Sequence, residues 1–475
     1  MPKSSFTKYL AFLLFANLLI KPIYIFGIET QAQNLLGTNT WGLYFGLLNF
    51  CFLFQIILDP GIHNQNTKWV AENRGNLSKR IGQTIIMKLW LGILFLFVLG
   101  IVGSWIGYPS SYYKLLGMIA LNFFLSSFYV FLKSHFPAMG DYGKETLFSV
   151  LDKILLIIIV GVQIYVLKDL SIESFILSIT AANIIAILIA YNRVRKITRI
   201  QFYFSTREAF SILKESFGFA LVGLFMSLFN RMDGVMLERM LDDEAYASGV
   251  YAAGYRILDA SNMFALLFAS LLLPMFAYRL HKDGEVGQLA AQAAKIMLVI
   301  VSMVVLSGYF YAEQIMNLLY VDYTQQYADS FRILILSFIG VGFSYIYGTL
   351  ITATGKLLIF NIVLFGGICI NWYLNYQWIP LETSIGAAKA TLITQVSVMI
   401  LQFLLVLKSF GLKSSLNSMI SVILYIILAV SMSYFISQIE IHWMIKLAGS
   451  IIIMIIASFL MGLIRLDTFN NAEVD

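Results

Sequence analysis

The feature that most constrains this chain is a series of long, uninterrupted apolar windows. Each is long enough for a helix to cross about 30 Å of hydrocarbon. The windows are residues 9–27, 41–58, 85–107, 115–133, 148–167, 172–192, 210–232, 248–275, 290–310, 328–352, 357–375, 384–407, 415–436 and 442–464. Because the runs are continuous, and a barrel strand needs only about ten alternating residues, they favour helices over strands. The sequence predicts an all-α polytopic membrane protein with about 14 transmembrane helices.

The charge content agrees with a membrane-embedded chain. Only 12% of the 475 residues are charged, whereas a soluble domain carries about 25%. The net charge of +6 comes from residues in short loops between the apolar runs. This distribution points to membrane lipids rather than nucleic acid as the surroundings of the chain.

The loops alternate between a basic set and an acidic set, as successive membrane crossings require. The basic set contains Lys68, Arg74, Lys79, Arg80, Lys133, Lys144, Arg193, Arg195, Lys196, Arg199, Arg207, Arg279, Lys282, Lys356, Lys408 and Lys413. The other set has only Lys114, Lys168 and Arg239 beside seven acidic residues. The positive-inside rule therefore predicts that both termini are cytoplasmic.

A weak internal repeat divides the chain. Gly42-Leu43-Tyr44 begins the second window, and Gly249-Val250-Tyr251 begins the eighth, 207 residues later. Six crossings restore the orientation, so the two copies form a parallel pseudo-two-fold repeat. We expect an N-terminal lobe at 1–205 (helices 1–6), a C-terminal lobe at 206–410 (helices 7–12), and helices 13–14 with a short cytoplasmic tail at 411–475.

Several charged side chains fall inside or close to the windows, where each costs roughly 2.5–3.5 kcal/mol on insertion scales. They are Lys21, Asp152, Lys153, Arg231, Asp233, Arg256, Asp259, Lys295, Arg332 and Lys389. Such residues tend to face a bundle interior or a wet cavity. Their excess of basic groups favours an anionic substrate such as a phosphate or pyrophosphate.

Simpler interpretations stay open for some of them. Lys153 and Lys389, like Lys295 and Arg332, lie within about two turns of a window's end and could extend to the interface. Lys21 is near the far end of the first window, so the same holds for it. Arg256 lies deeper, and Asp259 at i+3 is close enough to pair with it.

Arg231 and Asp233 cannot form a simple pair on one helix face, because they are two residues apart. At least one of them should face another helix or a cavity. We expect the charges of LFNRMDGVML, residues 228–237, to face a hydrated cleft between the two lobes.

No motif for catalysis, metal binding or a cofactor accompanies these charges. The chain has no Walker A sequence, no G-x-S-x-G and no H-E-x-x-H. Its four histidines are scattered without metal spacing. We expect no metal, no cofactor and no enzymatic activity.

Three stretches resemble the bacterial polysaccharide flippases of the O-antigen and capsule branch of the multidrug/oligosaccharidyl-lipid/polysaccharide exporter superfamily. They are LGTNTWGLYFGLLNFCFLFQIILDPG (36–61), NRMDGVMLERMLDDEAYASGVYAAGYRI (230–257) and NIVLFGGICINWYLNYQWIPLETSIGAAKATLITQ (361–395). The resemblance implies two six-helix lobes, often with two further helices. It also implies an inner-membrane transporter of polyprenyl-diphosphate-linked oligosaccharides that works by alternating access.

The family's cationic cavity maps onto Lys21, Arg231 and Arg256, followed by Lys153 and Lys389. Asp233 and Asp259 complete the expected substrate-binding set. H+ and Na+ are the candidate coupling ions. A cation-exporting drug antiporter of the same superfamily is the first alternative, since Asp233 and Asp259 could line an acidic pocket. A polysaccharide polymerase or ligase is the second, although the outer loops are short for one, and a non-transport scaffold is the third.

Overall fold

The described part of the chain is helical throughout. The computed structural model describes residues 16–17, 19–72, 77–139, 141–242, 245–281, 286–410 and 416–464, and these residues contain no strand. Twelve of their helices are long and apolar enough to cross a membrane. The prediction of an all-α polytopic membrane protein is confirmed.

The twelve helices agree with the fourteen windows once two differences are considered. Residues 9–15 and 18 of window 9–27 lie outside the described residues, so this window is not counted among the twelve. Windows 357–375 and 384–407 lie in one bent helical segment, α15 (Leu357–Phe410). This segment bends at Thr383, whose φ of 51° and ψ of −127° are not helical. Pro380 lies just before the bend and cannot donate a backbone hydrogen bond.

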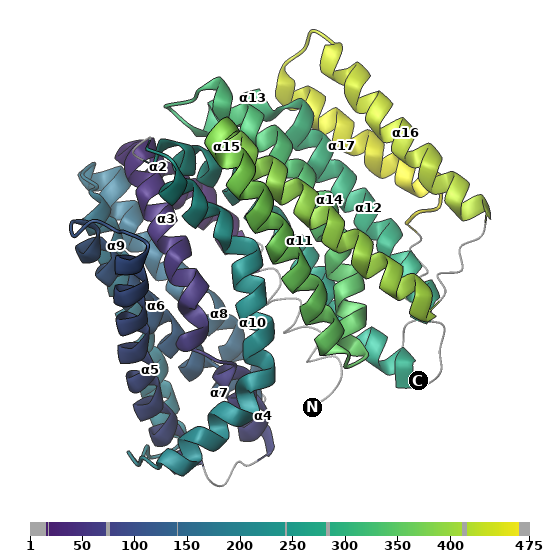
Figure 1. Ribbon diagram of the computed structural model, residues 1–475. Helices are drawn as coiled ribbons and strands as arrows, with labels where there is room; N and C mark the ends of the chain where they lie inside the picture. Colours follow the sequence, from purple (N-terminus) through teal and green to yellow (C-terminus); the bar gives the residue numbers. More distant parts are fainter. Residues whose placement is uncertain are drawn as a thin grey trace. The chain divides into compact units, whose positions relative to one another are not determined.

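Contacts divide the chain into two compact units, unit 1 (Met1–Gly249) and unit 2 (Val250–Asp475). The helices of unit 1 are α2 (Thr30–Leu36), α3 (Thr38–Phe54), α4 (Ile62–Glu72), α5 (Leu77–Trp105), α6 (Tyr112–Lys133), α7 (His135–Ala138), α8 (Tyr142–Gly161), α9 (Ile172–Ile197) and α10 (Thr206–Met240) (Figure 1). The units are defined by contacts and the lobes by a repeat, so the division at residues 205 and 410 stays a prediction.

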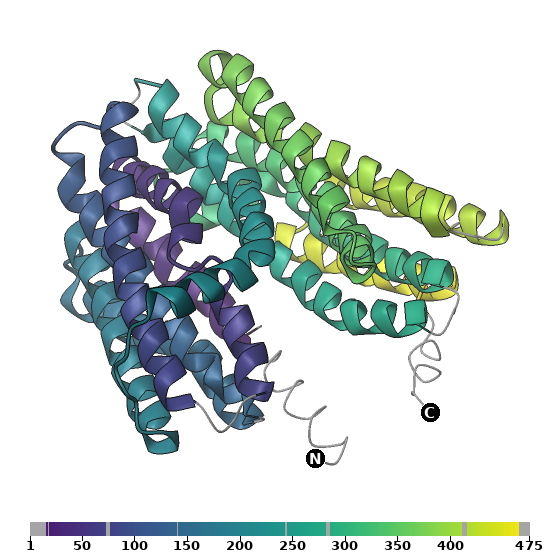
Figure 2. The ribbon, with the colours of Figure 1, turned by 60° about the horizontal axis from the view of Figure 1, so that its bottom comes forward.

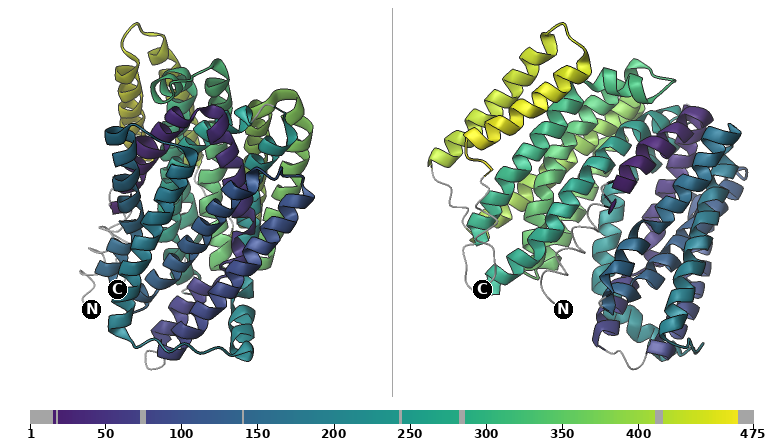
Figure 3. Two further views of the ribbon diagram at one scale, coloured as in Figure 1. Left: turned by 90° about the vertical axis from the view of Figure 1, so that its left-hand side faces the viewer. Right: turned by 180° about the vertical axis from the view of Figure 1, so that it is seen from behind.

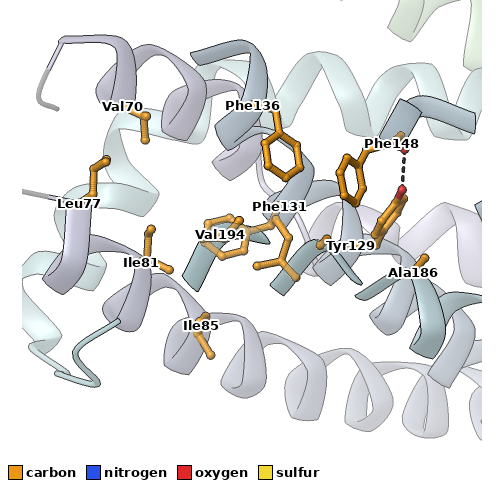
Figure 4. Packing of buried hydrophobic residues seen from close by; sticks show 12 residues of the cluster. Val70, Leu77, Ile81, Ile85, Tyr129, Phe131, Phe136, Phe148, Ala186 and Val194 are labelled. Carbon is orange, nitrogen blue, oxygen red and sulfur yellow. Dashed lines mark hydrogen bonds between the residues drawn. The ribbon is translucent and has the colours of Figure 1, made fainter. Parts of the chain in front are cut away.

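In unit 1, α3 packs along α10, and α6 and α8 pack against α9 (Figure 2). One core cluster joins α4, α5, α6, α7, α8 and α9 (Figure 4). Within it the rings of Phe136 and Phe148 stack at a centroid distance of 4.6 Å. The Tyr129 hydroxyl donates to the Phe148 carbonyl at 2.5 Å, so this phenol is buried without losing its hydrogen bond.

A close glycine seam joins α3 to α10 and to the first turn of α11 (Tyr246–His281). A Cβ on Gly42 would lie 1.9 Å from the Ala245 carbonyl oxygen, and one on Gly249 would lie 2.2 Å from the Thr38 carbonyl oxygen. The Ser248 hydroxyl donates to the Gly42 carbonyl at 3.1 Å. Gly42 and Gly249, the matching positions of the predicted repeat, therefore pack in the same seam.

Two π-helical segments interrupt the regular helices of unit 1, η1 (Ile25–Glu29) and η4 (Val162–Leu167). They are linked, because the Tyr165 hydroxyl donates to the Gly27 carbonyl at 2.8 Å. Widened turns of this kind leave backbone carbonyls open to other donors. A side chain of one widened helix thus bonds the backbone of the other.

Unit 2 contains most of α11, then α12 (Val286–Phe310), α13 (Ala312–Leu319), α14 (Gln325–Ala353), α15, α16 (Leu416–Gln438) and α17 (Trp443–Leu460). α14 packs on α15 and α12, while the α16–α17 pair packs on α12 (Figure 3). Tyr425 is buried at that contact, and its hydroxyl lies 2.7 Å from the Ser302 hydroxyl.

Candidate functional site

Three lysines gather within the helices of unit 1. Lys21 comes from the helical residues 19–24, Lys133 from the last turn of α6, and Lys153 from the middle of α8. Lys21 experiences the charges of Lys133, Lys153 and Asp152, and Lys133 experiences those of Asp152, Lys153 and Glu145. Three cations facing two carboxylates leave an excess positive charge, which an anion would offset. We call Lys21, Lys133 and Lys153 the lysine cluster.

Aromatic rings hold two members of the lysine cluster in place. The Lys153 ammonium lies 4.8 Å from the centre of the Tyr24 ring and 3.6 Å from Asp152 Oδ2. The Lys133 ammonium lies 5.6 Å from the Tyr129 ring. Ring faces attract cations without neutralising them, so these contacts position charge that can still act on a ligand.

The structure corrects the expected position of Lys21. The first helical stretch does not end near Gly27 but continues through η1 and α2 to Leu36. Lys21 is therefore several turns before the end of this helical stretch at Leu36. It lies near Lys133, the last residue of α6. Lys21 is thus further from the end of its helix than the window indicated.

Arg231 and Asp233 lie in the last third of α10 and face different surroundings, as their spacing predicts. The Arg231 guanidinium lies 4.5 Å from the centre of the Phe52 ring of α3. Asp233 is buried, with 2% of its surface exposed. A buried carboxylate beside a ring-stacked guanidinium gives this region polar groups in an otherwise apolar interface.

In unit 2 the predicted residues have different surroundings. Arg256 is 7% exposed on α11, and the half-buried Asp259 lies near the Tyr345 phenol of α14. Lys389 pairs with Glu382 Oε2 at 2.5 Å across the bend of α15, and both side chains are partly exposed. This pairing agrees with the interface interpretation of Lys389.

Of the seven predicted site residues, the structure brings Lys21 and Lys153 together in unit 1. Arg231 and Asp233 form a second location on α10. Arg256, Asp259 and Lys389 belong to unit 2. A shared cleft for all seven stays a prediction.

Sequence reasoning missed a buried cation, Lys88 of α5. Its side chain is 2% exposed. Its ammonium donates to Ser127 Oγ at 2.8 Å and to the Leu58 carbonyl at 3.1 Å, and it lies 3.4 Å from Asp59 Oδ2. Lys88 falls inside window 85–107, so the rule that singled out the other intramembrane charges could have found it.

Asp59, which follows α3, is held in place by His63 as well as by Lys88. The His63 backbone amide donates to Asp59 Oδ1 at 3.2 Å, and His63 Nδ1 lies 3.3 Å from Oδ2. Burial alone would raise the pKa of Asp59. The hydrogen bonds from His63 and the charge of Lys88 outweigh it and lower the pKa to about 2. The carboxylate is therefore ionised and structural.

Across the described ranges, no three His, Cys, Asp or Glu side chains are grouped as metal ligands. The chemistry that the described residues offer is electrostatic, with lysines and arginines for anions and buried carboxylates for hydrogen-bond donors or cations.

Comparison with solved structures identifies shared folds. The lipid II flippase MurJ in an inward closed conformation superposes with a TM-score of 0.69 at 16% identity, covering 97% of this chain and 98% of MurJ. An inward-facing multidrug resistance MATE transporter of the MOP superfamily gives 0.60 at 15% identity over 85% and 96% of the two chains. A MOP superfamily transporter from Pyrococcus furiosus, described as having a binding pocket of reverse polarity, gives 0.60 at 14% identity over 86% and 97%. At these identities the likeness concerns the fold.

No curated protein matches the sequence. The profile of a protein family described as polysaccharide biosynthesis protein matches residues 7–279, which is more than half of the chain. This match and the MurJ and MATE folds agree with the superfamily that the sequence stretches resemble. The chain therefore belongs to the polysaccharide biosynthesis protein family and has the fold of the MOP superfamily.

Proposed function

We propose that this protein is an alternating-access flippase that moves a polyprenyl-diphosphate-linked oligosaccharide across the bacterial inner membrane for surface polysaccharide synthesis. The observation that carries the proposal is the lysine cluster within the membrane-spanning helices of unit 1. The main barrier to flipping is the exposure of diphosphate charge to hydrocarbon. Fixed cations along the path lower that barrier, while the polyprenyl tail stays in lipid.

Family membership supports the same function. The family takes part in polysaccharide biosynthesis, and MurJ, which has the same fold, is a flippase for lipid II. The protein acts here as a transporter without enzymatic chemistry. Both termini are placed in the cytoplasm, following the alternation of basic and acidic loops.

Each predicted residue has a role in this scheme. Lys21, Lys153, Arg231 and Arg256 bind the diphosphate at successive stages, and Lys389 contributes from beside the bend of α15. Asp233 and Asp259 accept hydrogen bonds from sugar hydroxyls. H+ or Na+ drives the cycle.

A drug antiporter is the second candidate, and the buried Asp233 is the observation that favours it. An acidic group in a low-dielectric site attracts organic cations. A cationic dye distinguishes the two functions. An antiporter exports the dye, and its export depends on Asp233, whereas a flippase leaves it unmoved.

Arg256 provides the sharpest test of the flippase. Arg256→Ala should lower surface glycan at least tenfold at unchanged membrane protein level, because a buried guanidinium contact with phosphate is lost. Arg256→Lys should retain part of the function if charge alone matters, and little if bidentate geometry is needed. Arg332→Ala is the matched control, since Arg332 already pairs with Glu313 and Asp329 and should be dispensable. Surface glycan and membrane protein level are measured side by side.

The structural alternative makes a different prediction. If Arg256 only holds α11 through Asp259, Asp259→Asn should be as harmful as Arg256→Ala, and the double neutral variant should recover. Normal export by a well-inserted Arg256→Ala protein would remove Arg256 from the substrate path.

A further inference from the structure

The connection between α9 and α10 carries a concentration of exposed cations that stand apart from the ion pairs elsewhere. The described basic residues Lys88, Lys114, Lys144, Lys153, Arg239, Arg332 and Lys389 all have carboxylate partners. The cations between residues 193 and 207 are Arg193, Arg195, Lys196, Arg199 and Arg207. All five are exposed, and none has an ion-pair partner among the residues that the structure describes. Their charge is available to an external anion.

Large aromatic side chains are interleaved with these cations. Phe202 is 65% exposed and Phe210 is 69% exposed, and Tyr203 and Phe204 are also exposed. Four exposed rings over nine residues would be unfavourable against water. Aromatic residues beside cations are typical of a segment at the boundary between headgroups and hydrocarbon.

The connection is held to the start of α5 in a fixed arrangement (Figure 1). Gln83 and Ser205 exchange two hydrogen bonds, with Gln83 Nε2 donating to the Ser205 carbonyl at 2.9 Å and the Ser205 amide donating to Gln83 Oε1 at 2.8 Å. The Gln201 amide donates to the Ser78 carbonyl, and the Ser78 hydroxyl donates to the Arg199 carbonyl. The cations and rings are thus presented by an ordered backbone, which lowers the entropy lost on binding.

We propose that residues 193–210 form a docking surface for the headgroups of anionic phospholipids in the leaflet at this end of unit 1. The cations contact headgroup phosphates, and Phe202, Phe204 and Phe210 lie among the glycerol and upper acyl regions. Charge complementarity decides the occupant, since only Glu208 adds an acidic group to the segment. The inference concerns the lipid surroundings of the protein and does not depend on the transported substrate.

Purified full-length protein in phosphatidylcholine nanodiscs, titrated with phosphatidylglycerol, tests the surface. The test variant is Arg195→Gln with Arg199→Gln. The matched control is Lys356→Gln with Lys408→Gln, which removes the same charge from exposed sites on the predicted cytoplasmic side. Each cation near a charged membrane is worth on the order of a fivefold change in affinity. We expect roughly 30-fold weaker phosphatidylglycerol binding in the test variant. The control should change binding by only about twofold, because Lys356 and Lys408 lie outside residues 193–210 and have no part in the proposed surface.

A second pair of variants tests the rings. Phe202→Ser with Phe204→Ser should weaken phosphatidylglycerol binding and leave its salt dependence unchanged, because the five cations remain. Thermal unfolding in phosphatidylcholine alone should be the same for every variant used.

Three outcomes would overturn the proposal. They are equal loss in the test and control variants, saturation of the site by free glycerol phosphate, and no preference of the wild-type protein for phosphatidylglycerol over phosphatidylcholine. The last would be the result if an acidic protein, rather than lipid, occupied the surface. Binding is measured without transport, so failure of the flippase assignment would leave these results intact.

Discussion

A single buried lysine shows how a charge is tolerated inside these helices. Lys88 has three oxygen neighbours from two segments, the Leu58 carbonyl and Asp59 after α3, and Ser127 of α6. Its ammonium therefore keeps a full set of acceptors away from water, which is the condition for burying a charge without a large penalty. The Asp59–Lys88 pair, with Ser127, therefore connects the end of α3 to α5 and α6.

The Asp59 carboxylate gives this fastening a defined pH dependence. Its folded-state pKa of about 2 lies below the ordinary 3.8, so ionisation stabilises the fold above about pH 4, and the contribution is lost as the pH falls through 2. The shift corresponds to about 2 kcal/mol. The wild-type protein should exceed Asp59→Asn in free energy of unfolding at pH 6, and this difference should fall by about 2 kcal/mol between pH 6 and pH 2. Thermal unfolding in detergent measures it.

Asp169→Asn serves as the control for that measurement, because Asp169 is exposed. Its effect should be near zero at every pH. A wild-type advantage over Asp59→Asn that stays constant down to pH 2 would contradict the assigned role of Asp59.

At the residue scale the sequence identified charges but not their neighbours. Lys21 and Lys153 could be chosen because an apolar window makes any cation conspicuous. Their association with Lys133 could not be predicted from the sequence, because Lys133 lies at a window's edge and the association depends on how α6 and α8 pack. The Asp59–Lys88 pair joins residues separated by a connection and a helix, which no local pattern reveals.

Among the elements, the seam of α3 with α10 and the first turn of α11 has a very close backbone approach. It leaves no room for side chains at Gly42 or Gly249. Alternating access between the predicted lobes would separate α3 from α10, so this seam would have to close and open in each cycle. Close packing of small residues lets helices separate without breaking interdigitated side chains.

Gly42→Ala should therefore destabilise the structure by about 1–3 kcal/mol, because its methyl group meets the Ala245 carbonyl, a backbone atom that cannot rotate away. Gly117→Ala in α6 is the control, since a Cβ there has no neighbour within 4 Å. The control should be neutral or stabilising by up to about 1 kcal/mol. Thermal unfolding of both proteins in detergent gives the comparison, and equal melting temperatures would show that the seam can relax.

Apolar length predicted the long helices because membrane crossing is a matter of length and hydropathy. It did not predict the short helices α7 and α13, which depend on local packing. It also separated the two halves of α15 as independent windows. Their near-continuity through Thr383 depends on backbone geometry at one residue, where Gln326 donates to the Thr383 hydroxyl at 2.7 Å.

For the molecule as a whole, the alternation of charged loops predicts the topology. Reporter fusions after Arg207 and after Lys282, which lies outside the described residues, should both report the cytoplasm. A fusion after Asp169 should report the opposite side, because that loop belongs to the acidic set. A periplasmic signal at Arg207 or Lys282 would be incompatible with fourteen crossings in this orientation.

The fold class was accessible from the sequence because hydrocarbon permits few structures, and the windows exclude all but helices. The repeat is harder to establish, since it relies on one short motif at two positions. A superposition of residues 1–205 on 206–410 by a near-two-fold rotation stays a prediction.

The linked π-helical segments η1 and η4 have a mechanical consequence. Each is a π-bulge, a widened turn that contains one residue more than a regular α-helical turn. Such a defect can migrate when one backbone hydrogen bond is exchanged for its neighbour, and its passage moves the helix beyond it by a single residue. Because the Tyr165 hydroxyl of η4 is hydrogen-bonded to the Gly27 carbonyl of η1, a shift of one segment would act on the backbone of the other. Migration of the widened turn in η1 would shift the helical residues 19–24, which carry Lys21, by one residue without unfolding them.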